Sequence, residues 1–157
     1  MQPIIPCLWF DKQAEQAVKF YTSVFKNSSI EKTSYYGDAG PGQTGSVMTI
    51  IFQINGQEYM ALNGGPEYKF TPAISLYVNC ENQEEVDYYW EKLSEGGEKG
   101  PCGWPTDQYG VSWQVVPSIL GELLTDKDRV KANRVMQAML QMGKLEIAAL
   151  KRAYEQS

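Results

Sequence analysis

The sequence predicts an α+β fold made of two βαβββ modules and a helical segment after them. The order strand, helix, strands occurs twice along the chain, and Val18 to Tyr21 match Val86 to Tyr89 at an offset of 68 residues. Beyond Pro117 the apolar residues recur with helical spacing. We therefore predict one domain over residues 1–117, with modules at about 3–65 and 71–117, and a helical extension over residues 118–157.

The first module begins with an apolar run at residues 4–10, which is typical of a buried strand. A helix is predicted over residues 12–25, with Asp11 as its N-cap. Its apolar stripe consists of Ala14, Ala17, Val18, Tyr21, Val24 and Phe25. Strands are predicted at residues 29–36, 46–55 and 57–62, and the Asn55-Gly56 pair between the last two indicates a type I′ turn.

The second module repeats this order. A strand is predicted at residues 71–79 and a helix at 82–95, which Gly96 and Gly97 end. Short strands are predicted at residues 98–102 and 111–116. In the extension, a methionine-rich stripe predicts either core packing or a subunit contact, and a last helix follows it over residues 145–154. The stripe consists of Val135, Ala138, Met139 and Met142.

The composition excludes several classes of function. The chain has 157 residues, a net charge of −5 and no histidine. An acidic chain is a poor partner for nucleic acid or an anionic membrane, and no apolar run is long enough to span a bilayer. The lack of histidine excludes imidazole metal ligands and histidine-dependent nucleophilic catalysis. Three widely spaced cysteines and no signal-peptide pattern lead us to expect a cytoplasmic protein.

One glycine motif and three side chains are weak candidates for chemistry. Residues 40–45 fit the pattern G-x-G-x-x-G, but a strand is predicted after them. Because dinucleotide binding needs a helix N-terminus at that point, we predict a hairpin loop instead. The catalytic acid or base of an enzyme would have to be Cys102, Asp107, Tyr109 or a glutamate, and the first three lie in or near a turn-rich segment.

Several short segments resemble the PhnB-like branch of the vicinal oxygen chelate superfamily, which includes glyoxalase I, bleomycin-resistance proteins and extradiol dioxygenases. The similarity covers about residues 3–117, and the helical extension also fits the branch. The segments that carry it are residues 6–11, 20–21, 62–66, 102–104 and 110–117. The resemblance implies that the paired modules form a cup-shaped mixed sheet and that the protein is a two-fold homodimer.

In the superfamily a divalent metal sits in the cup, bound by residues from the first and last strand of each module. At the corresponding positions this sequence offers only Cys7, Asn63 and Gln114, and the second module's first strand begins without a ligand. Such a set is too weak to hold a divalent ion against water. We therefore predict that the protein has no metal site and needs no cofactor.

The resemblance and the ligand deficit together predict a small-molecule-binding protein of the bleomycin-resistance kind. We expect Gln114, Tyr77 and Asn63 to line its site, with Trp104 and Phe70 at the rim. The alternative for the Gln114 amide is a hydrogen bond to a side chain on the neighbouring strand.

Two other classes of function stay open. One is an enzyme of the superfamily, either a glyoxalase- or dioxygenase-like lyase or oxygenase, or the demethylubiquinone methyltransferase after which members of the branch are often labelled. The other is a protein-interaction module that uses the acidic surface and the helical extension.

Overall fold

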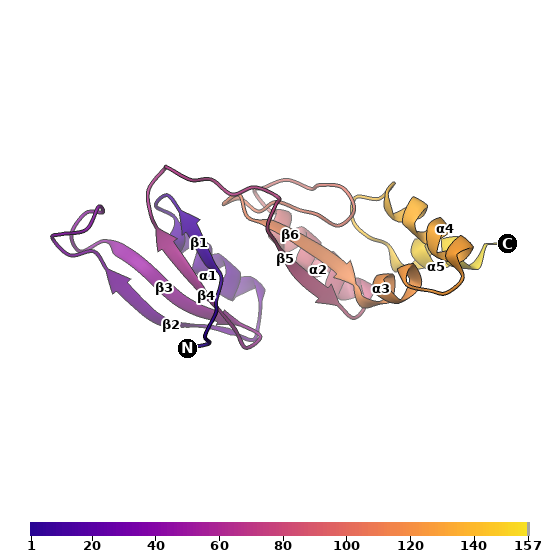
Figure 1. Cartoon of the computed structure of the whole chain (residues 1–157), viewed down its shortest axis with the longest axis horizontal. Helices are drawn as coiled ribbons and strands as arrows, with labels where there is room; N and C mark the ends of the chain where they lie inside the picture. The colour runs from indigo at the N-terminus through magenta and orange to yellow at the C-terminus, as the bar shows by residue number, and fades with distance from the viewer. Residues whose placement is uncertain (157) are drawn as a thin grey trace. The chain divides into compact units, whose positions relative to one another are not determined.

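The structure is a computed structural model that describes residues 1–156. The chain divides into two compact units, Met1–Phe70 and Thr71–Ser157. Each unit combines a sheet with at least one helix, which confirms the predicted α+β class (Figure 1). The division between the units falls between the two predicted modules, and the domain boundary after residue 117 stays a prediction.

The first unit has the βαβββ order that the sequence predicts. Its sheet has the strand order β1-β4-β3-β2, in which β1 is parallel to β4 and the other neighbours are antiparallel. The parallel pairing of the first and last strands brings the turn after β1 next to the end of β4. The elements are β1 (Cys7–Phe10), α1 (Ala14–Val24), β2 (Ser28–Tyr35), β3 (Val47–Ile54) and β4 (Gln57–Asn63).

Helix α1 packs on one face of this sheet, where it contacts β2, β3 and β4 (Figure 1). All six residues of the predicted stripe are buried, which confirms the stripe. The Tyr21 ring stacks on Phe52 with 6.3 Å between ring centroids. Burial of each large side chain contributes about 1.5–3 kcal/mol, so the stripe is the main force holding α1 to the sheet.

The turn between β3 and β4 follows the Asn-Gly prediction. Asn55 has a φ of 50° and Gly56 a φ of 83°. A type I′ turn requires positive φ at both central residues, which asparagine and glycine adopt most readily. The turn therefore sets the register in which Ile54 faces Gln57.

The second unit also pairs its first strand in parallel with its last, since β5 and β6 form a two-stranded parallel sheet. Helix α2 is capped by the Asn82 side chain, which accepts a hydrogen bond from the Glu85 backbone N–H. It ends just before Gly96, whose φ is 74°, as the sequence predicts. The elements are β5 (Ser75–Cys80), α2 (Gln83–Ser94), β6 (Ser112–Pro117), α3 (Ser118–Leu124), α4 (Arg129–Met139) and α5 (Ile147–Glu155).

The strand predicted at residues 98–102 is wrong. Only isolated bridges form there, from Glu98 to Thr106 and from Thr106 to Ser112. The segment contains Pro101, which donates no backbone hydrogen bond, and Gly100, where a Cβ would lie 2.1 Å from the Trp104 carbonyl oxygen. A Cβ at Gly97 would lie 2.1 Å from the Thr106 carbonyl oxygen, so the chain bends where a regular strand would run straight.

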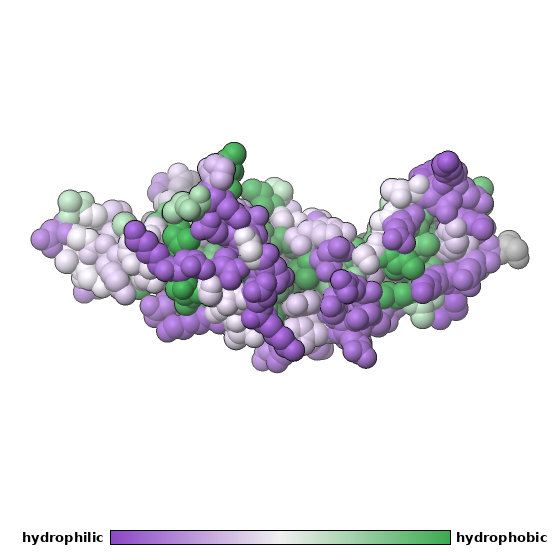
Figure 2. All heavy atoms as spheres, turned by 90° about the horizontal axis from the view of Figure 1, so that it is seen from below, coloured by the Kyte–Doolittle hydropathy of each residue, from purple (hydrophilic) through white to green (hydrophobic). Residues whose placement is uncertain are grey.

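The methionine-rich stripe belongs to the core of the second unit. Met139 and Met142 pack against a buried apolar cluster formed by β6, α3, α4, α5 and Leu145. Some apolar surface stays exposed on α4, at Met136 and just past its end at Leu140, and apolar atoms are visible among hydrophilic ones at the C-terminal helical end (Figure 2). The buried cluster consists of Val116, Leu120, Val135, Leu145 and Leu150.

None of the helices in residues 1–156 has the length and apolar character that a membrane crossing requires.

The fold makes a testable prediction about pH through Cys80, which is completely buried. Burial, and secondarily the nearby Glu85 carboxylate, raises the pKa of its thiol from 9.0 to about 12. As the pH rises above 9.0, the unfolded thiol releases its proton while the folded one keeps it, so the free energy of unfolding falls. We expect urea titrations across this range to show a steeper fall for the parent than for Cys80→Ala. Equal slopes would contradict the burial of the thiol.

Candidate functional site

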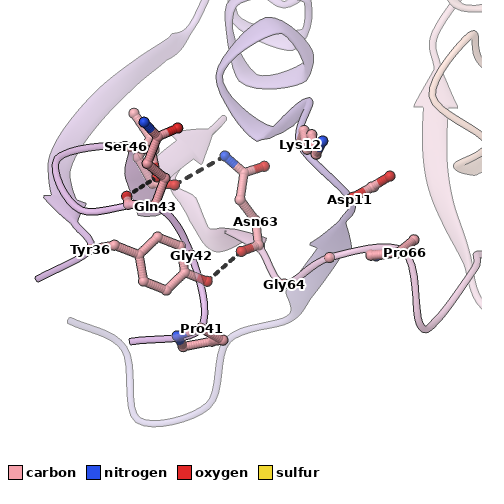
Figure 3. A pocket seen from close by; sticks show the side chains of 12 residues that line it. Asp11, Lys12, Tyr36, Pro41, Gly42, Gln43, Ser46, Asn63, Gly64 and Pro66 are labelled. Carbon is pink, nitrogen blue, oxygen red and sulfur yellow. Dashed lines mark hydrogen bonds between the residues drawn. The ribbon is translucent and has the colours of Figure 1, made fainter. Parts of the chain in front are cut away.

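A cavity of about 470 Å³ lies in the first unit (Figure 3). Three segments line it: the turn between β1 and α1, the loop between β2 and β3, and the end of β4 with residues 64–66. These segments are neighbours because β1 and β4 run parallel and end at the same edge of the sheet. The carboxyl ends of parallel strands are a common place for ligands to bind.

The Asn63 side chain connects the walls of the cavity. Its Oδ1 accepts a hydrogen bond from the Ala14 backbone N–H at 2.8 Å, and its Nδ2 donates to the Val47 carbonyl oxygen at 3.1 Å. Its own carbonyl oxygen accepts a hydrogen bond from the Tyr36 hydroxyl (Figure 3). One residue at the end of β4 thus connects α1, β3 and the loop after β2.

These contacts correct the prediction that Asp11 is the N-cap of the first helix. Helix α1 begins at Ala14, and Gln13 occupies the cap position without a side-chain hydrogen bond. The acceptor for the first helical N–H comes instead from Asn63, 49 residues along the chain. Asp11 is left in the turn before the helix, where it lines the cavity.

The glycine-rich loop encloses the ring of Tyr36. A Cβ at Gly40 would lie 2.6 Å from Cδ1 of this ring, and a Cβ at Gly42 would lie 2.3 Å from Cδ2. Only glycine allows the backbone this close on both edges. The loop leads into β3, which confirms the predicted hairpin loop. Two of its glycines, Gly40 and Gly42, pack against the Tyr36 ring. Sequence reasoning missed Tyr36, although the glycines beside it were the available signal.

The opposite wall is built around Trp9 in a similar way. A Cβ at Gly64 would lie 2.4 Å from Cε2 of the Trp9 ring, and the indole Nε1 donates to the Gly65 carbonyl oxygen at 2.9 Å. The backbone N–H of Gly64 donates to the Phe10 carbonyl oxygen, and the backbone N–H of Gly65 donates to the Asp11 carbonyl oxygen. The segment after β4 therefore stays attached to the end of β1 and forms a fixed wall.

The cavity has a mixed apolar and polar lining. Tyr36, Pro41, Val47 and Pro66 contribute apolar surface. Asp11, Lys12, Gln43 and Ser46 contribute charged and polar groups. A concave lining of this kind suits a small, partly apolar molecule whose polar group is fixed by a few side chains.

Two of the predicted ligand-binding residues lie side by side in the second unit. Tyr77 on β5 and Gln114 on β6 are partners in the parallel register. The Gln114 Nε2 donates to the Ser75 hydroxyl at 3.0 Å, which is the kind of cross-strand hydrogen bond that we considered as the alternative to ligand contact. The Tyr77 residue is 58% exposed. The burial of the remainder, and secondarily the nearby Cys80, raises the pKa of its phenol.

The other three predicted residues have different surroundings. Asn63 lies in the first unit and lines its cavity. Phe70 is half-buried with its ring edge-on to Phe10, 5.2 Å between centroids. Trp104 is half-buried in the turn-rich loop of the second unit, where its backbone N–H donates to the Pro101 carbonyl oxygen. The structure does not gather the five predicted residues in one unit.

Asp107, one of the three catalytic candidates from the sequence, has a structural role. It is buried, and its carboxylate accepts hydrogen bonds from the N–H groups of Tyr109 and Val111 and from Nε1 of Trp113, at 2.8, 3.1 and 2.8 Å. These bonds hold the loop to the last strand. Partial burial, and then the Asp107 charge, raises the pKa of the Tyr109 phenol, so this group is protonated at neutral pH.

The three cysteines have different surroundings, and burial disfavours the thiolate at two of them. Cys102 is half-buried at a φ of 55°, and its backbone N–H donates to the Met142 carbonyl oxygen. Burial raises the pKa of the Cys7 thiol and, more strongly, that of Cys80, which disfavours the reactive thiolate. In the described part of the chain no three His, Cys, Asp or Glu side chains are grouped so that they could hold a metal ion.

Comparison with known proteins identifies the family. Residues 2–116 match the family described as 3-demethylubiquinone-9 3-methyltransferase. A solved structure described as a putative 3-demethylubiquinone-9 3-methyltransferase, PhnB protein, from Bacillus cereus is 41% identical, with a TM-score of 0.65, over 74% of this chain and 99% of that one. The chain belongs to this family.

A second solved structure supports the fold alone. A protein from Pseudomonas aeruginosa is 21% identical with a TM-score of 0.62, over 74% of this chain and 98% of that one. A search of the curated proteins found no match. The predicted resemblance to the PhnB-like branch is thereby confirmed, while membership of the wider vicinal oxygen chelate superfamily stays a prediction. The family match ends before α3, so the three C-terminal helices lie outside it.

The geometry around Asn63 predicts a large loss of stability for Asn63→Ala. The substitution leaves the Ala14 N–H and the Val47 carbonyl oxygen without their partner, which costs about 1–3 kcal/mol. Urea unfolding measures this loss. The matched control is Asn27→Ala, in which an exposed loop side chain is removed, and we expect a change within about 0.5 kcal/mol. A similar small change for Asn63→Ala would contradict the connecting role of its amide.

Proposed function

We propose that the protein binds a small, partly apolar organic molecule in the cavity of its first unit and that binding requires no divalent metal. The observation that carries this proposal is the cavity itself, with a mixed lining and walls fixed by Asn63, by the Tyr36 ring and by the Trp9 indole. A pocket with such fixed walls binds without much loss of conformational entropy, which favours affinity for a small ligand.

The side chains at the positions of the family's metal ligands support the proposal that binding requires no divalent metal. Of the three residues at the family's ligand positions, Asn63 already uses both polar side-chain atoms, and Gln114, whose Nε2 donates to Ser75, would offer only one neutral oxygen. Cys7 would have to bind as a thiolate, which its raised pKa disfavours. These groups do not amount to a strong site for a divalent cation.

The description of the family suggests methyl transfer as another activity. Nothing in the cavity favours it specifically, because the only G-x-G-x-x-G segment encloses Tyr36 and precedes a strand. A ligand site on the β5–β6 face, near Gln114, Tyr77 and Trp104, and a two-fold homodimer remain proposals that rest on the resemblance. The cytoplasmic location remains an expectation.

The first prediction from this proposal concerns metal content. Protein purified without chelator should contain far less than one divalent ion per chain by elemental analysis, because the Asn63 amide is occupied, the Cys7 thiol is protonated and Gln114 offers a single neutral oxygen. A stoichiometric zinc, nickel or manganese ion that survives dialysis would contradict the proposal. It would also favour an enzyme that polarises its substrate through the metal.

The second prediction concerns ligand binding. A thermal-shift screen of small organic molecules should yield ligands, since a ligand at 100 times its dissociation constant adds about 2.7 kcal/mol to the free energy of unfolding. Gln43→Trp should abolish these shifts, because Gln43 is an exposed residue that lines the cavity and an indole there would occupy it.

The control for steric blocking is Gln16→Trp, which adds the same side chain at an exposed position on α1 outside the cavity. It should leave the shifts unchanged. The proposal is wrong if the ligands found by the screen bind Gln43→Trp as they bind the parent protein.

A further inference from the structure

The Asp11 carboxylate in the cavity wall has a buried oxygen whose environment the fold does not explain. Its Oδ1 is buried, and no hydrogen-bond donor of the described residues reaches it. The Asp11 backbone, in contrast, is satisfied, because its carbonyl oxygen accepts from the Gly65 N–H. Buried polar atoms nearly always have a partner, and a carboxylate oxygen without one is especially unfavourable.

The usual structural roles of an aspartate before a helix do not account for this oxygen. The cap acceptor for α1 is Asn63, and the helix begins three residues after Asp11. The ion pairs found within residues 1–156 do not include Asp11. The neighbouring Lys12 is exposed, so water screens its charge.

The position of Asp11 suggests what its partner is. Asp11 lies across the cavity from Tyr36, with Asn63 and Gly64 between them (Figure 3). A molecule in the cavity would therefore rest its apolar part near Tyr36 and Pro41 and present its other end to Asp11. Because Oδ1 is covered in this conformation, contact with a ligand in the cavity would require the carboxylate to rotate about the Asp11 side-chain bonds.

We propose that the ligand of this cavity is an organic cation, a small amine with an apolar body, whose ammonium group donates a hydrogen bond to the Asp11 carboxylate. The inference rests on the proposed function and names the chemical class of its ligand. An ammonium group supplies both the missing donor and the missing countercharge, and a charge-assisted hydrogen bond is stronger than one from a neutral hydroxyl.

Three probes of similar size and different head group test the proposal: phenethylamine, phenethyl alcohol and phenylpropionate. In calorimetric titrations of the full chain, the amine should bind about tenfold more tightly than the alcohol, and the carboxylate should bind most weakly. Asp11→Asn should lower the affinity for the amine by about tenfold and change the affinity for the alcohol by less than about twofold, because the amide keeps the shape of the carboxylate and loses its charge. The melting temperature of Asp11→Asn should stay the same or rise.

The control is Glu67→Gln, which removes one exposed negative charge in the same unit and should change the affinity for the amine by less than about twofold. The inference is overturned if the carboxylate binds as well as the amine, or if Asp11→Asn leaves the affinity for the amine unchanged. It is also overturned if none of the probes binds at millimolar concentration, or if Asp11→Asn lowers the melting temperature without affecting the amine.

The two proposals fail in different ways. If Gln43→Trp abolishes binding of all three probes while Asp11→Asn affects none, the cavity binds ligands but the amine class is wrong. If the amine binds Gln43→Trp and the parent equally, the cavity is not the site and both proposals fail.

Discussion

The first unit depends on the hydrogen bonds of one amide side chain, that of Asn63. A parallel pair such as β1 and β4 brings the start of the first helix to the end of the last strand, where both have unsatisfied backbone groups. The Asn63 side chain satisfies one backbone group of α1 and one at the start of β3, because Oδ1 accepts from the Ala14 N–H and Nδ2 donates to the Val47 carbonyl oxygen. The Tyr36 hydroxyl then attaches the glycine-rich loop to the same residue. The cavity exists because these three segments are held at a fixed spacing around one side chain.

The glycines of the first unit allow the backbone to pack closely against aromatic rings and do not form a phosphate-binding loop. Gly40 and Gly42 admit the Tyr36 ring, and Gly64 admits the Trp9 ring. Each contact places backbone against an aromatic face or edge, so the cavity wall is rigid although much of it is loop. Fixed walls of this kind lower the entropy cost of binding a small molecule. The polar groups, and Asp11 above all, would then select the chemistry of the ligand.

Local patterns in the sequence were sufficient for most of the fold. The apolar stripe from Ala14 to Phe25, the Asn55-Gly56 turn and the stop at Gly96 depend on neighbours within a few residues, and all three are found. The N-cap prediction for Asp11 was wrong because the true cap comes from Asn63, through a contact that only the folded sheet creates. For the same reason Tyr36 was not predicted as part of the site. The predicted strand at residues 98–102 was wrong because proline and close glycine contacts outweigh a weak strand pattern.

The central claim, that the cavity around Asn63 is the ligand site, is tested most directly by mapping a bound ligand with amide chemical shifts in solution. Addition of a ligand found by screening should shift the amides of residues 11–12, 42–43, 46–47 and 63–65, which line the cavity. The amides around Tyr77 and Gln114 should stay where they are, because they lie in the other unit. Shifts concentrated on β5 and β6, with residues 63–65 unaffected, would contradict the account.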